Sequence, residues 1–250
     1  MSASNRPLRQ LIQHLESPNA EMWMGLIDGV YAVAMTLIAI ELPELASEVI
    51  DTIDKQVEIT TISGILIYEL IVYTATFFIL YELWSFHKSI LKLSGIRHIR
   101  QNLTNGLILA LTCLGAGNIL LILNSKTDLA SEEINAGMSQ ATILKDWITH
   151  GTASSICMLL MIAVMFGLMS LLARSKANPE EIASLKALER NTRVKAFLFL
   201  LLPLNWLPMM FGSQTPIAPV GIMILVYIAL SNINEAKLRR RLSETFKAST

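Results

Sequence analysis

The sequence predicts an all-α, polytopic membrane protein, and three observations carry that prediction. Hydrophobic residues make up 53% of the 250 residues and charged residues only 16%, whereas an average soluble domain carries about 25% charge. The mean hydropathy is +0.51. The apolar residues also gather into blocks about 20 residues long, the length that a helix needs to cross the hydrocarbon core of a bilayer. These features exclude an ordinary soluble domain.

Six apolar segments meet or approach this length, and we expect six transmembrane helices. They cover residues 22–42, 61–83, 104–124, 152–173, 195–212 and 215–231. Pro203 and Pro208 interrupt the fifth segment around Asn205 and Trp206, which predicts a kink there. The fifth and sixth segments are joined by so few residues that they should form a tight hairpin, with Pro216 in the first turn of the sixth helix.

The chain should form one domain, a six-helix transmembrane unit over residues 1–250. Residues 1–21 precede the first span, and residues 233–250 form a basic tail. The longest connection, residues 173–195, contains a stretch from Pro179 to Ala196 that is rich in Ala, Leu, Glu and Lys. We expect this stretch to be a helical extension that starts after Asn178 and runs into the fifth span.

The basic residues predict the orientation, because Lys and Arg near span ends are retained on the cytoplasmic side. Of the 20 basic residues, 17 lie in the N-terminus, the second and fourth connections and the C-terminal tail. Only Lys55, Lys126 and Lys145 lie in the other loops, which are acidic. Both termini should therefore be cytoplasmic, and the even number of spans agrees with this, because it places both termini on the same side of the membrane.

Few side chains are available for chemistry. The ionisable residues inside spans are Asp28, Glu69 and Glu82, and the histidines are scattered along the chain. No H-E-x-x-H, G-x-S-x-G, P-loop or G-x-G-x-x-G motif is present. We therefore expect no enzyme, no cofactor and no metal site, and a net charge of zero gives no reason to expect nucleic acid as a partner.

Short stretches in the first two spans carry a family resemblance. Asp28 precedes the run Gly29-Val30-Tyr31-Ala32-Val33-Ala34, and the first span ends on Glu41-Leu42-Pro43. Trp84-Ser85-Phe86-His87-Lys88 closes the second span. These stretches resemble the transmembrane protein 175 family of bacterial and lysosomal potassium channels, with its R-x-x-x-F-S-D signature and W-x-x-H stretch. At the Arg, Phe and Ser positions of that signature stand Met22, Leu26 and Ile27.

The resemblance implies a potassium-selective channel in the cell membrane, by resemblance a bacterial inner membrane. In such a homotetramer the first helix of each subunit lines an axial pore, and K⁺ is the permeating ion. The implied constriction is Val33, Leu37 and Ile40, and Thr36 would contribute the preference for potassium. No T-V-G-Y-G filter is present in the chain.

Helical geometry gives an independent view of these residues. Val33, Leu37 and Ile40 follow i, i+4, i+7 and share one face, with Thr36 beside them. Asp28 lies about 140° from that face at 100° per residue. If the Val33 face lines a pore, Asp28 should therefore point into the protein, toward Trp84 or His87.

Each feature also has a plainer explanation. A stripe of Val, Leu and Ile commonly serves helix packing. Glu41 can form a ring at the outer mouth that concentrates cations, or it can belong to an ordinary acidic loop. Two other functions also remain open. A proton-coupled secondary transporter would use Glu69 and Asp28, although we find no inverted repeat, and a noncatalytic membrane scaffold would have no transport path.

Overall fold

A computed structural model gives the fold and describes residues 20–51, 59–94, 99–174, 182–213, 216–218 and 222–232. Every regular element in these ranges is helical. The long helices are α2 (Ala20–Asp51), α3 (Ile59–Ser94), α4 (Ile99–Asn135), α6 (Thr152–Leu172) and α7 (Ile182–Leu201). The shorter ones are α5 (Gln140–Thr149), the 3₁₀ helix η2 (Leu202–Trp206), α8 (Leu207–Met210) and the helix Ile222–Asn232, called the 222–232 helix below.

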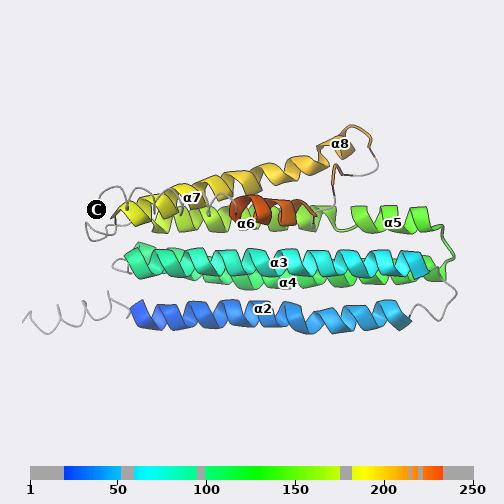
Figure 1. The fold of residues 1–250 in the computed structure, drawn as a ribbon, viewed down its shortest axis with the longest axis horizontal. Coiled ribbons are helices and arrows are strands. Elements are labelled where there is room, and N and C mark those ends of the chain that lie inside the picture. Colours follow the sequence, from blue (N-terminus) through cyan, green and yellow to red (C-terminus); the bar gives the residue numbers. More distant parts are fainter. Residues whose placement is uncertain are drawn as a thin grey trace, which may run out of the picture.

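The long helices lie side by side, and the chain runs back and forth between the two ends of the bundle (Figure 1). The starts of α2, α4 and α7 lie at the same end as the ends of α3 and α6. α2 forms one edge and packs mainly on α3 and α4, while α6 packs on α7, α4 and α3. One side of α2 is therefore left uncovered by the rest of the described chain.

The core runs along the inner faces of the helices. Its largest fully buried side chains include Tyr31 of α2, Leu83 of α3 and Phe199 of α7. Aromatic rings connect the helices on the side away from α2: Phe166 lies 6.2 Å from Phe86 and 5.7 Å from Phe199, measured between ring centroids. Aromatic pairs at such separations stabilise a packed core beyond the area they bury.

Four helices of the described chain are long and apolar enough to cross a membrane. They are Met22–Ile40, Leu70–Ser94, Ile99–Ile122 and Thr152–Leu172, which match the first four predicted spans. The fifth and sixth predicted spans do not reach this standard. The first half of α7 carries Lys and Arg and the helix ends at Leu201. In the sixth predicted span the described helix runs only from Ile222 to Asn232, which is shorter than a membrane crossing needs. The chain is therefore an all-helical protein, in its described part, with four helices that fit a polytopic membrane protein.

The predicted kink in the fifth span is present. α7 gives way after Leu201 to η2, in which Pro203 stands at the start, and then to α8 with Pro208. The amide of Asn205 pairs with the backbone of Ala218 in both directions, at 2.8 and 2.9 Å. The prediction for Pro216 is wrong, because this residue lies in the non-helical segment that Asn205 holds.

Two predicted helix ends are also wrong. α2 does not end at Glu41-Leu42-Pro43 but continues to Asp51, and α3 continues past Lys88 to Ser94. A helix of 32 residues is roughly 48 Å long, so α2 extends well beyond the roughly 30 Å of hydrocarbon that the apolar pattern marks. Hydropathy therefore located the span, whereas helix-forming residues outside the span set where the helix ends.

α7 confirms the helical extension before the fifth span, since it is described from Ile182 onward. The predicted start after Asn178, the N-terminal residues 1–19 and the tail 233–250 lie outside the described ranges.

Candidate pore-lining site

The uncovered side of α2 displays the predicted stripe. Val33, Leu37 and Ile40 are exposed by 60%, 46% and 63%, and Thr36 between them is also exposed. The stripe continues toward the start of the helix through Met22 and through Gly25, Leu26, Gly29 and Ala32, all exposed. Large apolar side chains exposed along one face need lipid or another protein surface to cover them.

The opposite side of α2 is buried against α3 and α4. Ile27, Tyr31, Ala34 and Ile38 are each exposed by 2% or less, and they follow the i, i+4, i+7, i+11 spacing of one helix face. Packing of this buried face fixes the rotation of α2 about its axis. It therefore determines that the Val33 face points away from the bundle.

Thr36 is the polar residue in the central part of the exposed stripe. Its Oγ1 donates a hydrogen bond to the carbonyl oxygen of Ala32 at 2.7 Å. This bond uses the hydroxyl proton, so the oxygen lone pairs remain to face a cation or water.

Asp28 is joined to α3 by two different donors. Trp84 Nε1 donates to Asp28 Oδ1 at 2.8 Å, and Lys88 Nζ donates to both carboxylate oxygens at 2.9 and 2.8 Å. The Lys88 Nζ also lies 4.9 Å from the centroid of the Trp84 ring, within the range of a cation–π contact. Three side chains thus form one cluster between α2 and α3.

Lys88 is the member of this cluster that sequence reasoning missed. A signal was present: Lys88 follows Trp84 by four residues, so both lie on one face of a helix. The signature Arg position is Met22 in this chain, and Lys88 supplies a positive charge for Asp28 from the neighbouring helix.

His87 does not bind Asp28 but belongs to a second, fully buried set of contacts. Its Nε2 donates to Asn105 Oδ1 at 2.5 Å, and the Tyr31 hydroxyl lies 3.5 Å from its Nδ1. The Tyr31 and His87 rings meet edge to face with centroids 6.0 Å apart. These contacts link α2, α3 and α4. They also give the buried polar groups hydrogen-bond partners, without which their burial would be costly.

A third polar cluster holds the far side of α3. Lys195 of α7, only 2% exposed, donates to Glu82 Oε1 and to Ser231 Oγ, and Ser231 donates to the same Glu82 oxygen at 3.0 Å. The Nζ lies 4.7 Å from the Phe86 ring centroid and 5.6 Å from that of Tyr227. α3 therefore contacts α2 through Trp84 and Lys88 and contacts α7 through Glu82.

Two residues of interest lie beyond these contacts. The side chains of Glu41 and Glu69 are outside the part of the chain that the structure describes, although both positions are helical. Within that part, no three His, Cys, Asp or Glu side chains gather as a metal ion would need.

Residues 23–115 match the family model of the endosomal/lysosomal potassium channel TMEM175. The matched region holds α2 from Trp23, α3 and slightly less than half of the length of α4, and it includes the exposed stripe, the Asp28 cluster and His87. The match confirms the resemblance to a family of potassium channels, which is not a class of enzymes. Neither a curated protein nor a solved structure matches the chain.

Proposed function

We propose that the chain is a potassium-selective cation channel that passes K⁺ passively through an axial pore lined by α2. The observation that carries the proposal is the uncovered Val33 face of α2, which lies on an edge helix within the region that matches the channel family. In this proposal, the side of α2 that its own chain leaves bare faces the pore axis and the α2 helices of other copies.

The proposed conduction path uses apolar and hydroxyl layers. Val33, Leu37 and Ile40 narrow the axis, and an apolar ring of this kind impedes ions by dewetting. Thr36 lies between these layers, and its hydroxyl oxygen can replace part of the hydration shell of an ion. No carbonyl-lined T-V-G-Y-G filter is needed in this arrangement.

The pore requires several copies of the chain. A single α2 cannot surround an axis, and closed cyclic symmetry is the common solution for identical subunits. We propose a homotetramer, as the family resemblance implies. The small exposed residues Gly25, Gly29 and Ala32 support close approach of neighbouring α2 helices, because small side chains allow helix backbones to come near each other in membranes.

The proposed roles of Asp28, Trp84 and His87 are structural. Asp28 is bound by Trp84 and Lys88 beside the stripe, and His87 joins the three helices behind α2. These contacts hold the pore-lining helix at a fixed rotation and depth relative to α3. In this proposal Asp28, Trp84 and His87 are positioning residues and do not contact the permeating ion.

The proposed membrane placement is a six-span, multi-pass protein of the cell membrane with both termini cytoplasmic. In support, exposed basic residues gather at the end of the bundle where α3 ends and α4 and α7 begin. They include Lys92, Arg100, Lys186, Arg190 and Arg193. The other end holds the acidic residues Asp128, Glu132 and Asp146. Glu41 then lies toward the outer mouth of the pore, where a ring of carboxylates would concentrate cations.

The transporter alternative has less support. It needs proton-carrying carboxylates in a transport path, and Asp28 is instead held by an ion pair with Lys88. The scaffold alternative gives no reason for the matched region to carry an exposed stripe on an edge helix.

Ion flux into liposomes separates the three functions. Purified full-length chain is reconstituted in phosphatidylcholine vesicles with a potassium gradient and no pH difference, and flux is followed with and without a proton ionophore. We expect potassium flux down its gradient at zero pH difference and a smaller flux for sodium. Flux only when a pH difference is imposed would favour the transporter, and absence of flux from correctly assembled protein would favour the scaffold.

A further inference from the structure

α7 carries a basic face that ion conduction does not use. Lys186, Arg190 and Arg193 are all exposed and follow each other at spacings of four and three residues. This spacing places the three side chains on one side of the helix. Arg174, which follows the end of α6 by two positions, lies next to this face and contacts Glu189 of α7.

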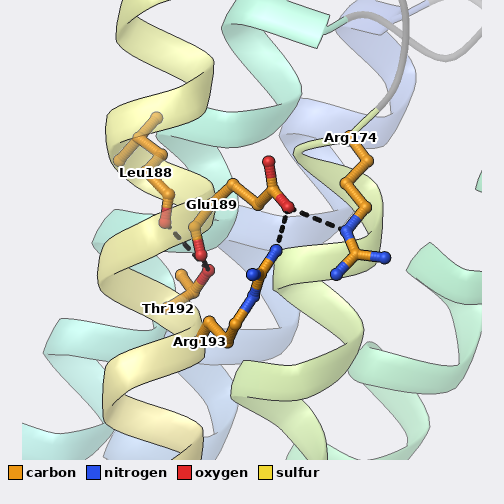
Figure 2. A network of polar contacts seen from close by, with 5 residues as sticks. All are labelled: Arg174, Leu188, Glu189, Thr192 and Arg193. Carbon is orange, nitrogen blue, oxygen red and sulfur yellow. Dashed lines mark hydrogen bonds and ion pairs between the residues drawn. The ribbon is translucent and has the colours of Figure 1, made fainter.

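Figure 2 shows how two of the arginines are held. Arg174 Nε donates to Glu189 Oε1 at 2.8 Å, and Arg193 donates to the same oxygen. Both arginine side chains remain more than half exposed, at 52% and 59%, while that of Glu189 is 19% exposed. One carboxylate thus orients two guanidinium groups and leaves a net positive charge on the cluster. The remaining face adds the charges of Lys186 and Arg190.

The base of this cluster is buried. Thr192, which is fully buried, donates through its Oγ1 to the carbonyl oxygens of Leu188 and Glu189 at 2.8 and 3.1 Å. The turn that bears Glu189 and Arg193 is therefore packed against the bundle. An ordered backbone lowers the entropy cost of presenting the arginines in one place.

The sequence of α7 changes character directly after Arg193. Val194, Phe197, Leu198 and Leu201 are large, apolar and exposed by 40% to 59%. An exposed face that turns from basic to apolar within about one helical turn marks the level where headgroups meet hydrocarbon. The basic face then lies at headgroup depth.

We propose that this basic face of α7, completed by Arg174, binds the phosphate headgroup of an anionic phospholipid in the cytoplasmic leaflet. Guanidinium groups bind phosphate oxygens through paired hydrogen bonds, and the cytoplasmic leaflet supplies anionic lipid. The apolar residues from Val194 onward would contact the acyl chains. The inference rests on the proposed membrane orientation and not on ion conduction.

Lipid binding to the purified full-length chain tests the proposal. The protein is mixed with detergent micelles that contain equal amounts of phosphatidylglycerol and phosphatidylcholine, and the lipids retained per chain are counted by native mass spectrometry. We expect preferential retention of phosphatidylglycerol. The double variant Arg190→Gln/Arg193→Gln should weaken it by at least fivefold, since each basic residue near an anionic surface contributes about fivefold. Retention of phosphatidylcholine should not change.

The matched control is Lys92→Gln/Arg100→Gln, which removes two exposed charges from α3 and α4 at the same end of the bundle. It should keep the preference. Equal loss in both double variants would show a general charge effect and overturn the proposal, as would no loss in the α7 variant. If Arg193→Gln disturbs folding, Lys186→Gln/Arg190→Gln leaves both Glu189 ion pairs intact and must show the same loss.

A soluble anion is separated from a lipid by a second probe. Glycerol 3-phosphate carries the phosphate without acyl chains and should not compete at millimolar concentration. Displacement of phosphatidylglycerol by it at that concentration would assign the face to a soluble phosphate ester and contradict the lipid assignment. These measurements record no ion flux, so their failure leaves the channel proposal standing, and absence of flux leaves the lipid proposal standing.

Discussion

The buried ion pair between Glu82 and Lys195 is the contact whose loss should cost the most stability. Lys195→Met leaves the Glu82 carboxylate buried without its cation, and breaking a buried pair in this way costs about 3–5 kcal/mol. We expect a large fall in the thermal unfolding midpoint of the purified protein. The double variant Glu82→Gln/Lys195→Met removes both charges and should recover much of that loss.

The double-mutant cycle checks this account. An exposed pair provides the control, because Arg193→Gln loses only an ion pair that is more than half solvent-accessible on the arginine side and should cost at most about 1 kcal/mol. A double variant that is as unstable as the sum of the two single variants would mean that Glu82 and Lys195 do not stabilise each other.

Lys126, which lies beyond the apolar part of α4, gives a pH-dependent prediction. Burial lowers the pKa of its ammonium group from 10.5 to about 8. The unfolded chain therefore binds more protons than the folded chain between about pH 8 and 10.5, and the free energy of unfolding should rise with pH over this window. Thermal unfolding midpoints are measured across this pH window for the original chain and for Lys126→Met. The midpoint should rise with pH in the original chain and not in the variant. An equal rise with pH in both proteins would contradict the prediction.

Residue-level reasoning found Asp28 and Trp84 but not the contacts of Glu82. Asp28 and Trp84 belong to short motifs that can be located from local spacing alone. Glu82 meets Lys195 across 113 positions and Ser231 across 149. Such a pair forms only when two particular helices pack together. The periodicity of residues along one helix does not reveal which helices those are.

The rotation of α2 about its axis decides which of its faces can line a pore. Asp28→Asn weakens the bonds to Trp84 and Lys88, and hydrogen bonds to a charged group contribute about 1.5–3 kcal/mol. We therefore expect lower stability or lower yield of the assembled oligomer, measured by thermal unfolding and size exclusion. The ratio of potassium to sodium permeability should not change in the protein that does assemble.

Asp128→Asn is the matched control, since it removes an exposed carboxylate of α4 far from this cluster, and it should leave stability and assembly unchanged. Normal assembly of Asp28→Asn combined with an altered permeability ratio would place Asp28 in the conduction path.

The presence of the helices was easier to predict than the residues at which they end. Four apolar segments predicted the four candidate spans, and prolines predicted the break after Leu201. The predicted end of α2 at Pro43 was wrong, because the chain stays helical through Pro43 as far as Asp51. A proline removes one backbone donor, which does not by itself end a helix when the residues on both sides favour it.

The topology of the whole molecule can be tested by cysteine labelling. Cys113 and Cys157 are exposed, so both are first replaced by Ser. A cysteine at Met138, between α4 and α5, should react with a membrane-impermeant maleimide from the outside of intact cells. A cysteine at Ser184 of α7 should react only after the membrane is opened. The reverse pattern would invert the orientation and would move Glu41 to the cytoplasmic mouth.

Composition and the length of the apolar segments predicted an all-helical protein with membrane-spanning helices, but the surface that covers the exposed stripe of α2 does not come from the described part of its own chain. The stripe on α2 could be recognised from spacing, and its outward orientation followed only when Ile27, Tyr31, Ala34 and Ile38 were found buried on the opposite side. In the proposed homotetramer the pore lies between copies of the chain, so its width depends on how the copies assemble.

Single-channel recording of Leu37→Ala tests whether the uncovered face of α2 lines the pore. Truncating a bulky apolar layer at a constriction should widen it and raise the single-channel conductance several-fold. Thr36→Ala should instead reduce the preference for potassium, read from the reversal potential under opposed potassium and sodium gradients.

Leu121→Ala is the matched control, because Leu121 is an equally apolar, exposed residue of α4 that should contact lipid. We predict that Leu37→Ala raises the conductance while Leu121→Ala leaves it unchanged. Unchanged conductance in well-assembled Leu37→Ala, together with unchanged selectivity in Thr36→Ala, would contradict the account and move the pore away from α2.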